Sequence, residues 1–417
     1  MTTRKHFKRL VRARMARTGE RYTVARSHLA ANAPAEGEWE LRGGLHADTA
    51  AFANVLANTG VVAPHSGAPL SEAMVLGVGG GLGAGYILWE FAQHGERIVV
   101  LGFRRQWQYP ARWAAETATR LGLHAEVHET GGARGAAQRL DALLDRGLPA
   151  IVWADAHRLG HRHLPERLDG HGGGPVVIYG RAGGRVLVDD RSAGRLTVPA
   201  ERLADARARV GSYGHRLIEI DPALVELDGD RLRAAVEEGL ALQVEHLSAR
   251  SDSFSLPAWS KWARTLTGTG RKAWPAVFAD GRGLGSATAS IYTGAGRGEH
   301  LRSLYAEFLE EAAALLGRIE LRDVAASWRQ AAAAWERVAD TALAPGDELR
   351  ALIDASASAV GRGDEAAAEA ERLARERWAL QARRDAGLPD GEILFGQLAE
   401  AVAAVYAAER AAVEAQA

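Results

Sequence analysis

The chain has 417 residues and a mass of 44.5 kDa, which allows two or three domains. The hydrophobic fraction of 47% and the charged fraction of 25% are typical of a globular protein, and the absence of cysteine excludes disulfide scaffolds, cysteine-ligated zinc, iron–sulfur clusters and thiol nucleophiles. The 51 Lys and Arg residues against 52 Asp and Glu give a net charge of -1, which argues against a general polyanion binder.

Positive charge gathers in residues 1–31, where Arg and Lys far outnumber the one acid, Glu20. Phe7, Leu10, Val11 and Met15 form a helical stripe there. Such a basic helical arm can bind nucleic acid or an acidic carrier protein, and it also fits an organelle transit peptide. We favour a solvated arm that packs its stripe on the body of the protein, followed by a linker at 32–42.

No apolar run in the sequence reaches the ~18 residues of a membrane helix, and nothing resembles a secretory signal. We therefore expect a cytoplasmic protein without membrane contact.

Residues 43–221 predict a mixed α/β or α+β domain. A helix is expected from Asp48 to Asn58, and two more at Ala111–Leu121 and Gly135–Arg146. The β-branched runs predict strands at Arg97–Phe103, His124–His128, Ala150–Ala154, Val176–Gly180, Arg185–Asp189 and Leu217–Ile220. Residues 181–184 (Arg-Ala-Gly-Gly) predict a hairpin between the fourth and fifth of these strands, so that the late strands pair antiparallel.

Residues 222–417 predict a mostly helical domain. Helical spacing of apolar residues runs from Leu301 to Leu316, and Ala-rich helices are expected at 322–342, 346–360, 363–386 and 391–415. The segment 251–300, with three tryptophans among small residues, is expected to wrap one domain on the other.

The glycine block at 77–85 suggests nucleotide binding, but no register gives G-x-G-x-x-G and no P-loop ending follows. Close backbone approach, with room for a ligand, is the better interpretation. His157 and His161 stand four residues apart, as metal ligands on a helix can, but Gly160 and Pro165 oppose a long helix, so we favour a surface histidine cluster. We expect neither a cofactor nor a metal ion.

The most informative pattern is a set of residues in chain order. His46, Ala47 and Asp48 open the first helix, His171 precedes a strand, and Asp190 ends the next strand. This is the order found in papain-like enzymes, in which a helix N-terminus stabilises an anionic nucleophile, a histidine takes a proton and an acid orients the imidazole. His171 would be the base, Asp190 its orienter, and the amides near Ala47 and Asp48 the oxyanion site.

Several motifs of this region resemble one family. They are His46–Asp48, the run Leu76–Gly83 with Tyr86 and Trp89-Glu90 after it, Asp169–Gly173 before Val176–Gly180, and Val188–Arg191. The chain resembles the BtrH N-terminal domain family, named for the acyltransferase of butirosin biosynthesis, followed by its usual helical domain. The resemblance implies a papain-like domain at 43–221 and a helical domain at 222–417. It also implies substrate binding by the glycine block and its flank (Gly79, Gly80, Gly81, Gly83, Tyr86 and Trp89).

Two departures from the family pattern affect the chemistry. Ala47 occupies the position of the family's nucleophilic cysteine, and Gly174 occupies the position of a histidine just before the strand. An engineered substitution would explain Ala47 but not Gly174, which favours natural divergence.

Three functions remain open. The first is an acyltransferase of specialised metabolism without a cysteine nucleophile, taking an acyl thioester or carrier-bound acyl group to an amine on a small molecule or peptide. The second is an inactive papain-like binding or scaffolding module. The third is an interaction protein in which residues 1–31 bind nucleic acid or an acidic carrier.

Overall fold

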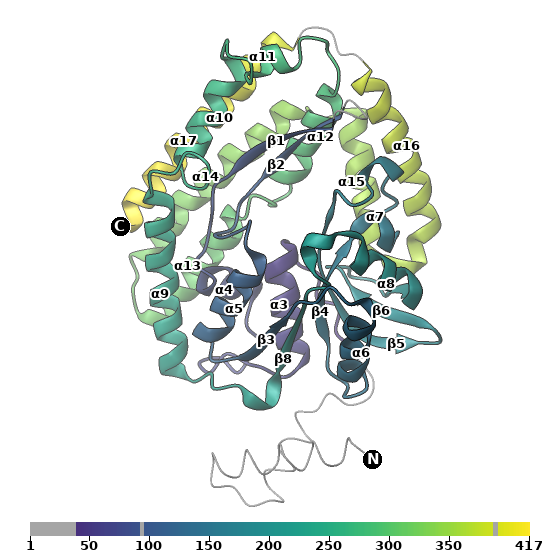
Figure 1. Cartoon of the computed structure of the whole chain (residues 1–417). Helices are drawn as coiled ribbons and strands as arrows, with labels where there is room; N and C mark the ends of the chain where they lie inside the picture. Colours follow the sequence, from purple (N-terminus) through teal and green to yellow (C-terminus); the bar gives the residue numbers. More distant parts are fainter. Residues whose placement is uncertain (1–38, 92–95, 387–390) are drawn as a thin grey trace, which may run out of the picture.

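The structure is a computed structural model that describes residues 39–91, 96–386 and 391–417 (Figure 1). The basic arm and most of the linker lie outside the described residues. A mixed α/β part comes first in the chain and a mostly helical part follows, as the sequence predicts. The papain-like form of the fold stays a prediction, as does the domain boundary at residue 221.

The α/β part is built on a six-stranded sheet with the order β3-β8-β4-β5-β6-β7, in which every neighbouring pair is antiparallel. Its strands are β3 His124–His128, β4 Ala150–Asp155, β5 Gly173–Ala182, β6 Arg185–Asp189, β7 Leu196–Pro199 and β8 Leu217–Asp221. The predicted hairpin joins β5 to β6 through Gly183 and Gly184, whose positive φ angles of 54° and 79° suit a tight turn.

Strand β4 is buried on both faces, and its alternating side chains separate two layers. Ile151 and Trp153 belong to the core that contains α3, whereas Ala150, Val152 and Ala154 pack with α6 and α8. The helices of this part are α3 Ala47–Asn58, α4 Glu72–Val78, α5 Pro110–Arg120, α6 Ala133–Leu144, α7 Ala156–Leu159 and α8 Ala200–Arg209.

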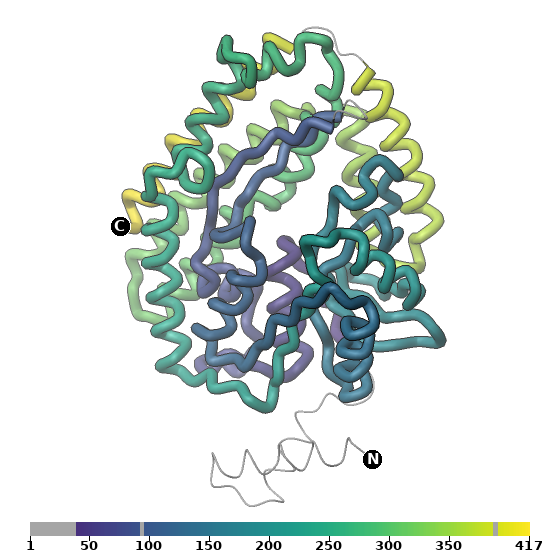
Figure 2. The backbone as a smooth tube through the Cα atoms, viewed as in Figure 1, coloured from purple at the N-terminus to yellow at the C-terminus, as the bar shows by residue number. Residues whose placement is uncertain are grey.

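A separate two-stranded ribbon, β1 Tyr86–Phe91 with β2 Glu96–Leu101, crosses over α12 (Figure 2). The sequence predicts β2 but not β1, because Tyr-Ile-Leu-Trp-Glu-Phe has apolar residues on both faces and therefore lacks the alternation of a half-exposed strand.

The helical part begins with α9 and continues to the end of the chain. Its helices are α9 Gly229–Ser248, α10 Pro257–Thr267, α11 Trp274–Val277, α12 Leu284–Ala295, α13 Arg302–Leu316, α14 Leu321–Ala342, α15 Glu348–Gly361, α16 Ala367–Asp385 and α17 Glu392–Gln416. One hydrophobic core runs through both parts, since Phe52 and Met74 share it with Trp259, Phe308 and Trp335.

Candidate active site

The first turn of α3 is held by a carboxylate from the next helix. Glu72 accepts the backbone N–H of Leu45 at 2.8 Å and that of His46 at 2.9 Å, and it also accepts the hydroxyl of Thr49. His46 caps the helix by accepting the N–H of Asp48 on Nδ1. Within the described residues, the N–H of Ala47 has no acceptor, so it remains available as a hydrogen-bond donor at the helix start.

Asp48 faces a buried arginine. Its carboxylate lies 2.8 Å from Nη2 of Arg104, which is fully buried and stacks on the indole of Trp113 at 4.2 Å. Burial opposes ionisation of Asp48, but the Arg104 guanidinium outweighs it and holds the pKa of Asp48 below its usual value. Burial also lowers the pKa of His46 to about 4, so this imidazole is neutral at pH 7. The helix start therefore carries an ionised Asp48 beside a neutral His46.

Asp189, the last residue of β6, ties this strand to α3. Asp189 is buried and accepts hydrogen bonds from Trp39, Asn54 and the amide of Arg191. Burial raises the pKa of Asp189.

Asp190 forms a dyad with His161 rather than with His171. Oδ2 of Asp190 lies 2.7 Å from Nε2 of His161 and 2.7 Å from Nη2 of Arg162. Although Asp190 is buried, the Arg162 charge and the His161 hydrogen bond hold its pKa well below the usual range. The ionised carboxylate can only accept, so Nε2 of His161 donates. Nδ1 of His161 is buried without a hydrogen-bond partner among the described residues.

The expected pairing of Asp190 with His171 is therefore corrected. His171 is exposed on the turn before β5, and its ring packs edge-on against Phe91 with centroids 4.8 Å apart. The interpretation of the histidines at 157–163 as a surface cluster also fails for His161, whose side chain is only 7% exposed. The predicted absence of a long helix there is confirmed, since α7 ends at Leu159 with Gly160 in the left-handed conformation.

Arg191 joins the dyad to the helix start. It follows Asp190 with a positive φ of 61°, and its guanidinium donates to the carbonyl of Leu45 and lies 3.6 Å from Glu299. The positive charge of Arg191 contributes to lowering the pKa of both His46 and Asp190. A non-glycine residue in this conformation is strained, and such strain is common at functional sites.

Glu299 is a site residue that sequence reasoning missed, in addition to the partners of Asp190. It comes from the loop between α12 and α13, where Arg297 and Leu301 also have positive φ. Burial raises the pKa of Glu299, while Arg191 and Arg162 oppose that rise. The glycine-rich run Gly296-Arg-Gly-Glu-His indicates a turn with polar side chains. It does not indicate that this loop, between α12 and α13, packs against the end of β6.

The glycine block is packed against side chains. An added Cβ at Gly79 would meet the indole of Trp113, one at Gly80 the side chain of Arg105, and one at Gly81 the amide of Gln243. The carbonyl of Gly83 accepts a hydrogen bond from Arg302. Close backbone approach explains these glycines, and their role in substrate binding stays a prediction.

The two aromatic residues after the block differ in exposure. Tyr86 stacks on Trp262 at 4.9 Å and accepts a hydrogen bond from Trp274, whereas Trp89 is 52% exposed.

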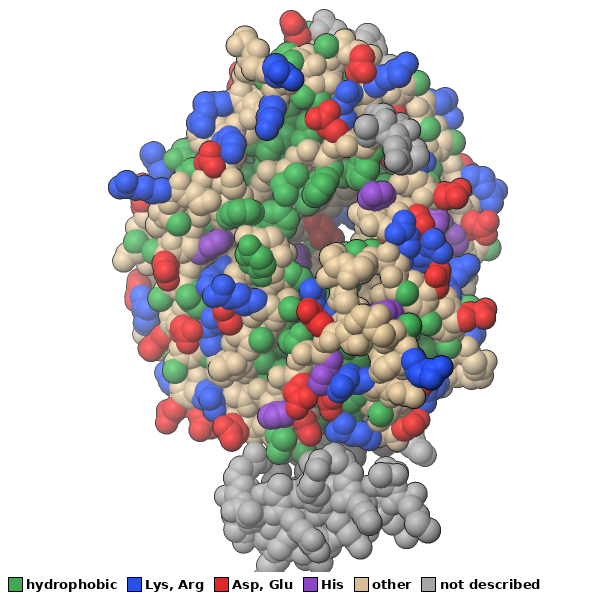
Figure 3. Space-filling view, viewed as in Figure 1, with side chains coloured by type: hydrophobic (Ala, Val, Ile, Leu, Met, Phe, Trp, Pro, Cys, Tyr) green, Lys and Arg blue, Asp and Glu red, His purple; other side chains and the backbone are tan. Residues whose placement is uncertain are grey.

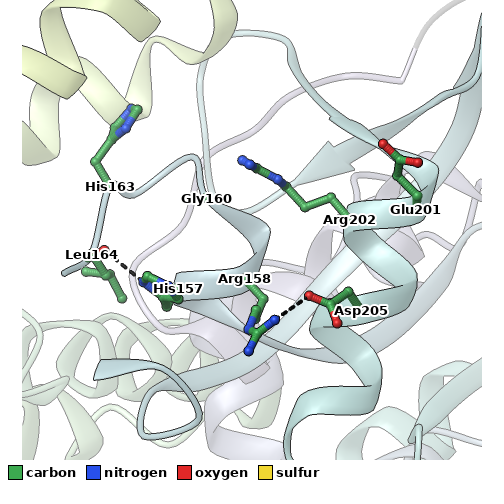
Figure 4. A pocket seen from close by; sticks show the side chains of 8 residues that line it. All are labelled: His157, Arg158, Gly160, His163, Leu164, Glu201, Arg202 and Asp205. Atoms are coloured by element: carbon green, nitrogen blue, oxygen red, sulfur yellow. Dashed lines mark hydrogen bonds and ion pairs between the residues drawn. The ribbon is translucent and has the colours of Figure 1, made fainter. Parts of the chain in front are cut away.

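Two pockets meet around Gly160. One, of ≈ 170 Å³, is lined by His161, and it shares Gly160, His163 and Arg202 with a more open pocket of ≈ 550 Å³. Figure 4 shows Arg202 and His163 around the open pocket, with Arg158 paired to Asp205. No group of His, Asp and Glu in the described part of the chain is arranged to hold a metal ion.

The molecule is also hollowed at its centre, between the sheet and the helical part, and acidic and histidine side chains occur around this hollow (Figure 3).

Comparisons with known proteins agree with the motifs. Residues 46–191 match the family model described as butirosin biosynthesis protein H, N-terminal. None of the curated proteins compared with the chain matches it. In the described ranges, no helix combines the length and apolar character needed to cross a membrane. The match begins at the α3 cap and ends at Arg191, so it spans the helix start and the dyad. The segment from residue 46 to residue 191 is therefore similar to the butirosin biosynthesis protein H N-terminal family.

Proposed function

We propose that this protein transfers an acyl group from a thioester directly to an amine, without an acyl-enzyme intermediate. The observation that carries the proposal is the His161–Asp190 dyad with an unpaired Nδ1, connected through Arg191 to the start of α3. Similarity of residues 46–191 to an acyltransferase-related family supports it.

The proposed reaction needs no protein nucleophile, because a thioester is already activated. The amine nitrogen attacks the thioester carbonyl carbon, and the amide of Ala47 at the helix start stabilises the oxyanion. Nδ1 of His161 takes the proton of the attacking amine. The C–S bond then breaks, and the imidazolium returns that proton to the leaving thiolate, which gives one amide and one thiol. Asp190 stabilises the imidazolium.

Thiol release is the direct test. The chain has no cysteine, so every thiol detected in a mixture of an acyl-N-acetylcysteamine donor and an amine comes from the donor. We expect equal amounts of thiol and amide, and no acyl adduct in the intact-protein mass. His161→Ala should lower the rate about 10²–10⁴-fold, whereas His65→Ala, at an exposed position, should not.

The His171→Ala variant tests whether the base is His161 of the dyad or His171, which chain order predicts. Loss of activity in His171→Ala with retention in His161→Ala would assign the base to His171. An acyl adduct on the protein would contradict direct transfer.

A binding module is the second candidate, and one observation favours it. Asp190 is already neutralised by Arg162, so the dyad can serve as a purely structural ion pair. If the protein binds the acyl thioester but releases no thiol with any of a range of amines, the binding-module function would be favoured. Binding of a carrier protein or nucleic acid through residues 1–31 stays a prediction.

A further inference from the structure

The β1–β2 ribbon carries apolar residues on both faces, and its charged residues Glu90, Glu96 and Arg97 lie towards the tip. In an antiparallel pair, directly opposite residues lie on the same face. One face, which includes the Tyr86–Leu101 and Leu88–Val99 pairs, packs on the hydrophobic core. The other face lies outside the core clusters found among the described residues. It carries the apolar residues Ile87, Trp89, Phe91, Ile98 and Val100, with Glu96 opposite Phe91 at the tip.

This second face extends beyond the strands. Gly85 and Gly102 form the next pair, and Cβ atoms on them would collide with the indole of Trp107. Trp107 thus lies over this glycine pair, with the half-exposed Phe254 at 6.2 Å from it. We call the row from Trp107 through Ile87 and Trp89 to Phe91, with Val100 and Ile98 opposite, the apolar strip.

The apolar strip is joined to the candidate site at its base and to the segment before β5 at its tip. At its base, Arg104 follows Gly102 by two residues and binds Asp48 in the first turn of α3. At its tip, Phe91 packs on His171 and Glu96 pairs with Arg167. In Figure 3 a band of apolar side chains follows the ribbon along the edge of the central hollow.

We infer that the apolar strip binds the hydrocarbon or aryl part of the acyl group that the site transfers. The inference rests on the proposed function and names its substrate class, a hydrophobic acyl thioester. The attachment of the strip to the first turn of α3 favours this occupant over a second copy of the chain, because a ligand lying along the strip reaches the proposed oxyanion site. From Gly85 to Phe91 the strip extends about 20 Å, enough for a long acyl chain.

A ladder of acyl-N-acetylcysteamine thioesters (acetyl, butanoyl, hexanoyl and octanoyl) tests the strip by calorimetric titration without an amine. Burial of each methylene should tighten the Kd about fourfold. Trp89→Ala should reduce the gain in affinity per added methylene, and Ile98→Asp should weaken octanoyl binding at least about tenfold. Ile319→Asp, at a position 64% exposed in the turn between α13 and α14, is the matched control and should bind as the parent does.

Equal Kd values for the acetyl and octanoyl thioesters, or parental affinity in both strip variants, would overturn the inference. A concentration-dependent dimer in sedimentation velocity that Ile98→Asp dissociates would overturn it as well, because a second copy would then cover the strip. His161→Ala keeps this test separate from the proposed function, since that variant should lose transfer and retain the chain-length dependence.

Discussion

Nε2 of His161 lies 2.7 Å from Oδ2 of Asp190, although a strand and a hairpin separate the two residues in the chain. Their contact depends on the antiparallel pairing of β4 with β5 and of β5 with β6, which brings the end of β4 beside the end of β6. The base of the proposed reaction therefore follows β4, whereas the position expected for a histidine from the family resemblance, Gly174, lies in β5.

Asp190→Asn should lower the free energy of unfolding at pH 7 by about 3 kcal/mol, because His161 and Arg162 lose an ionised partner. The pKa of Asp190 is depressed in the folded protein, so its stabilisation is complete above the unfolded pKa of about 3.9 and is lost as pH falls below it. Urea unfolding at pH 7 and pH 3 checks both points. The free energies of unfolding of the parent and of Asp190→Asn should differ less at pH 3 than at pH 7. An equal difference at both pH values would contradict an ionised Asp190 with a depressed pKa.

Ala47→Cys should place a thiol at the start of α3 with a pKa below the ~8.5 of a free cysteine, because the helix N-terminus and the neighbouring arginines favour the thiolate. Alkylation rates measured against pH give this pKa. The variant should also form an acyl-enzyme visible in the intact-protein mass. A thiol titrating near ~8.5 would show that the helix start does not stabilise an anion.

His46→Asn should remove part of the acid sensitivity of the fold. The pKa of His46 is about 4 in the folded protein and about 6.5 when unfolded, so its contribution is complete above pH 6.5 and is lost as pH falls to 4. The loss is about 3 kcal/mol at most. Asparagine keeps the helix cap, so the variant should lack this part of the pH dependence. Parallel stability curves for the two proteins between pH 7 and pH 4 would argue against a neutral His46.

Glu409→Gln should destabilise the protein by about 3–5 kcal/mol. Arg302 and Glu409 are both fully buried 2.7 Å apart, and Glu409 also accepts the indole N–H groups of Trp259 and Trp335. The glutamine would leave the Arg302 charge uncompensated. Arg329→Ala, which removes a half-exposed pair with Glu310, is the control and should have little effect on urea unfolding.

Gly77→Ala and Gly135→Ala should change stability in opposite directions. Both glycines lie in helices, but an added methyl meets the ring of Phe308 at Gly77 and open space at Gly135. We expect a loss of about 1–3 kcal/mol at Gly77 and a gain of up to about 1 kcal/mol at Gly135. Thermal unfolding checks both. A neutral Gly77→Ala would show that α4 and α13 are not closely packed there.

Local patterns predicted the elements that have one buried face or clear turn residues. The Arg185–Asp189 strand has the expected bounds because charged residues flank its short apolar run Val-Leu-Val and a glycine turn precedes it. The sequence did not reveal β7, which has four residues and ends in a proline, or β1, whose two faces are both apolar.

The candidate site was harder to predict because its contacts are distant in sequence. Asp190 and the start of α3 were found from chain order, and both are joined to Arg191 in the structure. The partner of Asp190 was not found, because a histidine before a strand and one after the preceding strand fit chain order equally well. Glu299 reaches the site from beyond the family segment, so no pattern within residues 46–191 could reveal it.

The shared core has a consequence for protein engineering. Phe308 occupies the space above Gly77, and Arg302 binds the carbonyl of Gly83, so the helices following residue 221 cover the glycine block directly. Transplanting the family segment alone into another scaffold would expose this backbone and remove Glu299. A functional graft must therefore include the loop between α12 and α13 and the helices that support it.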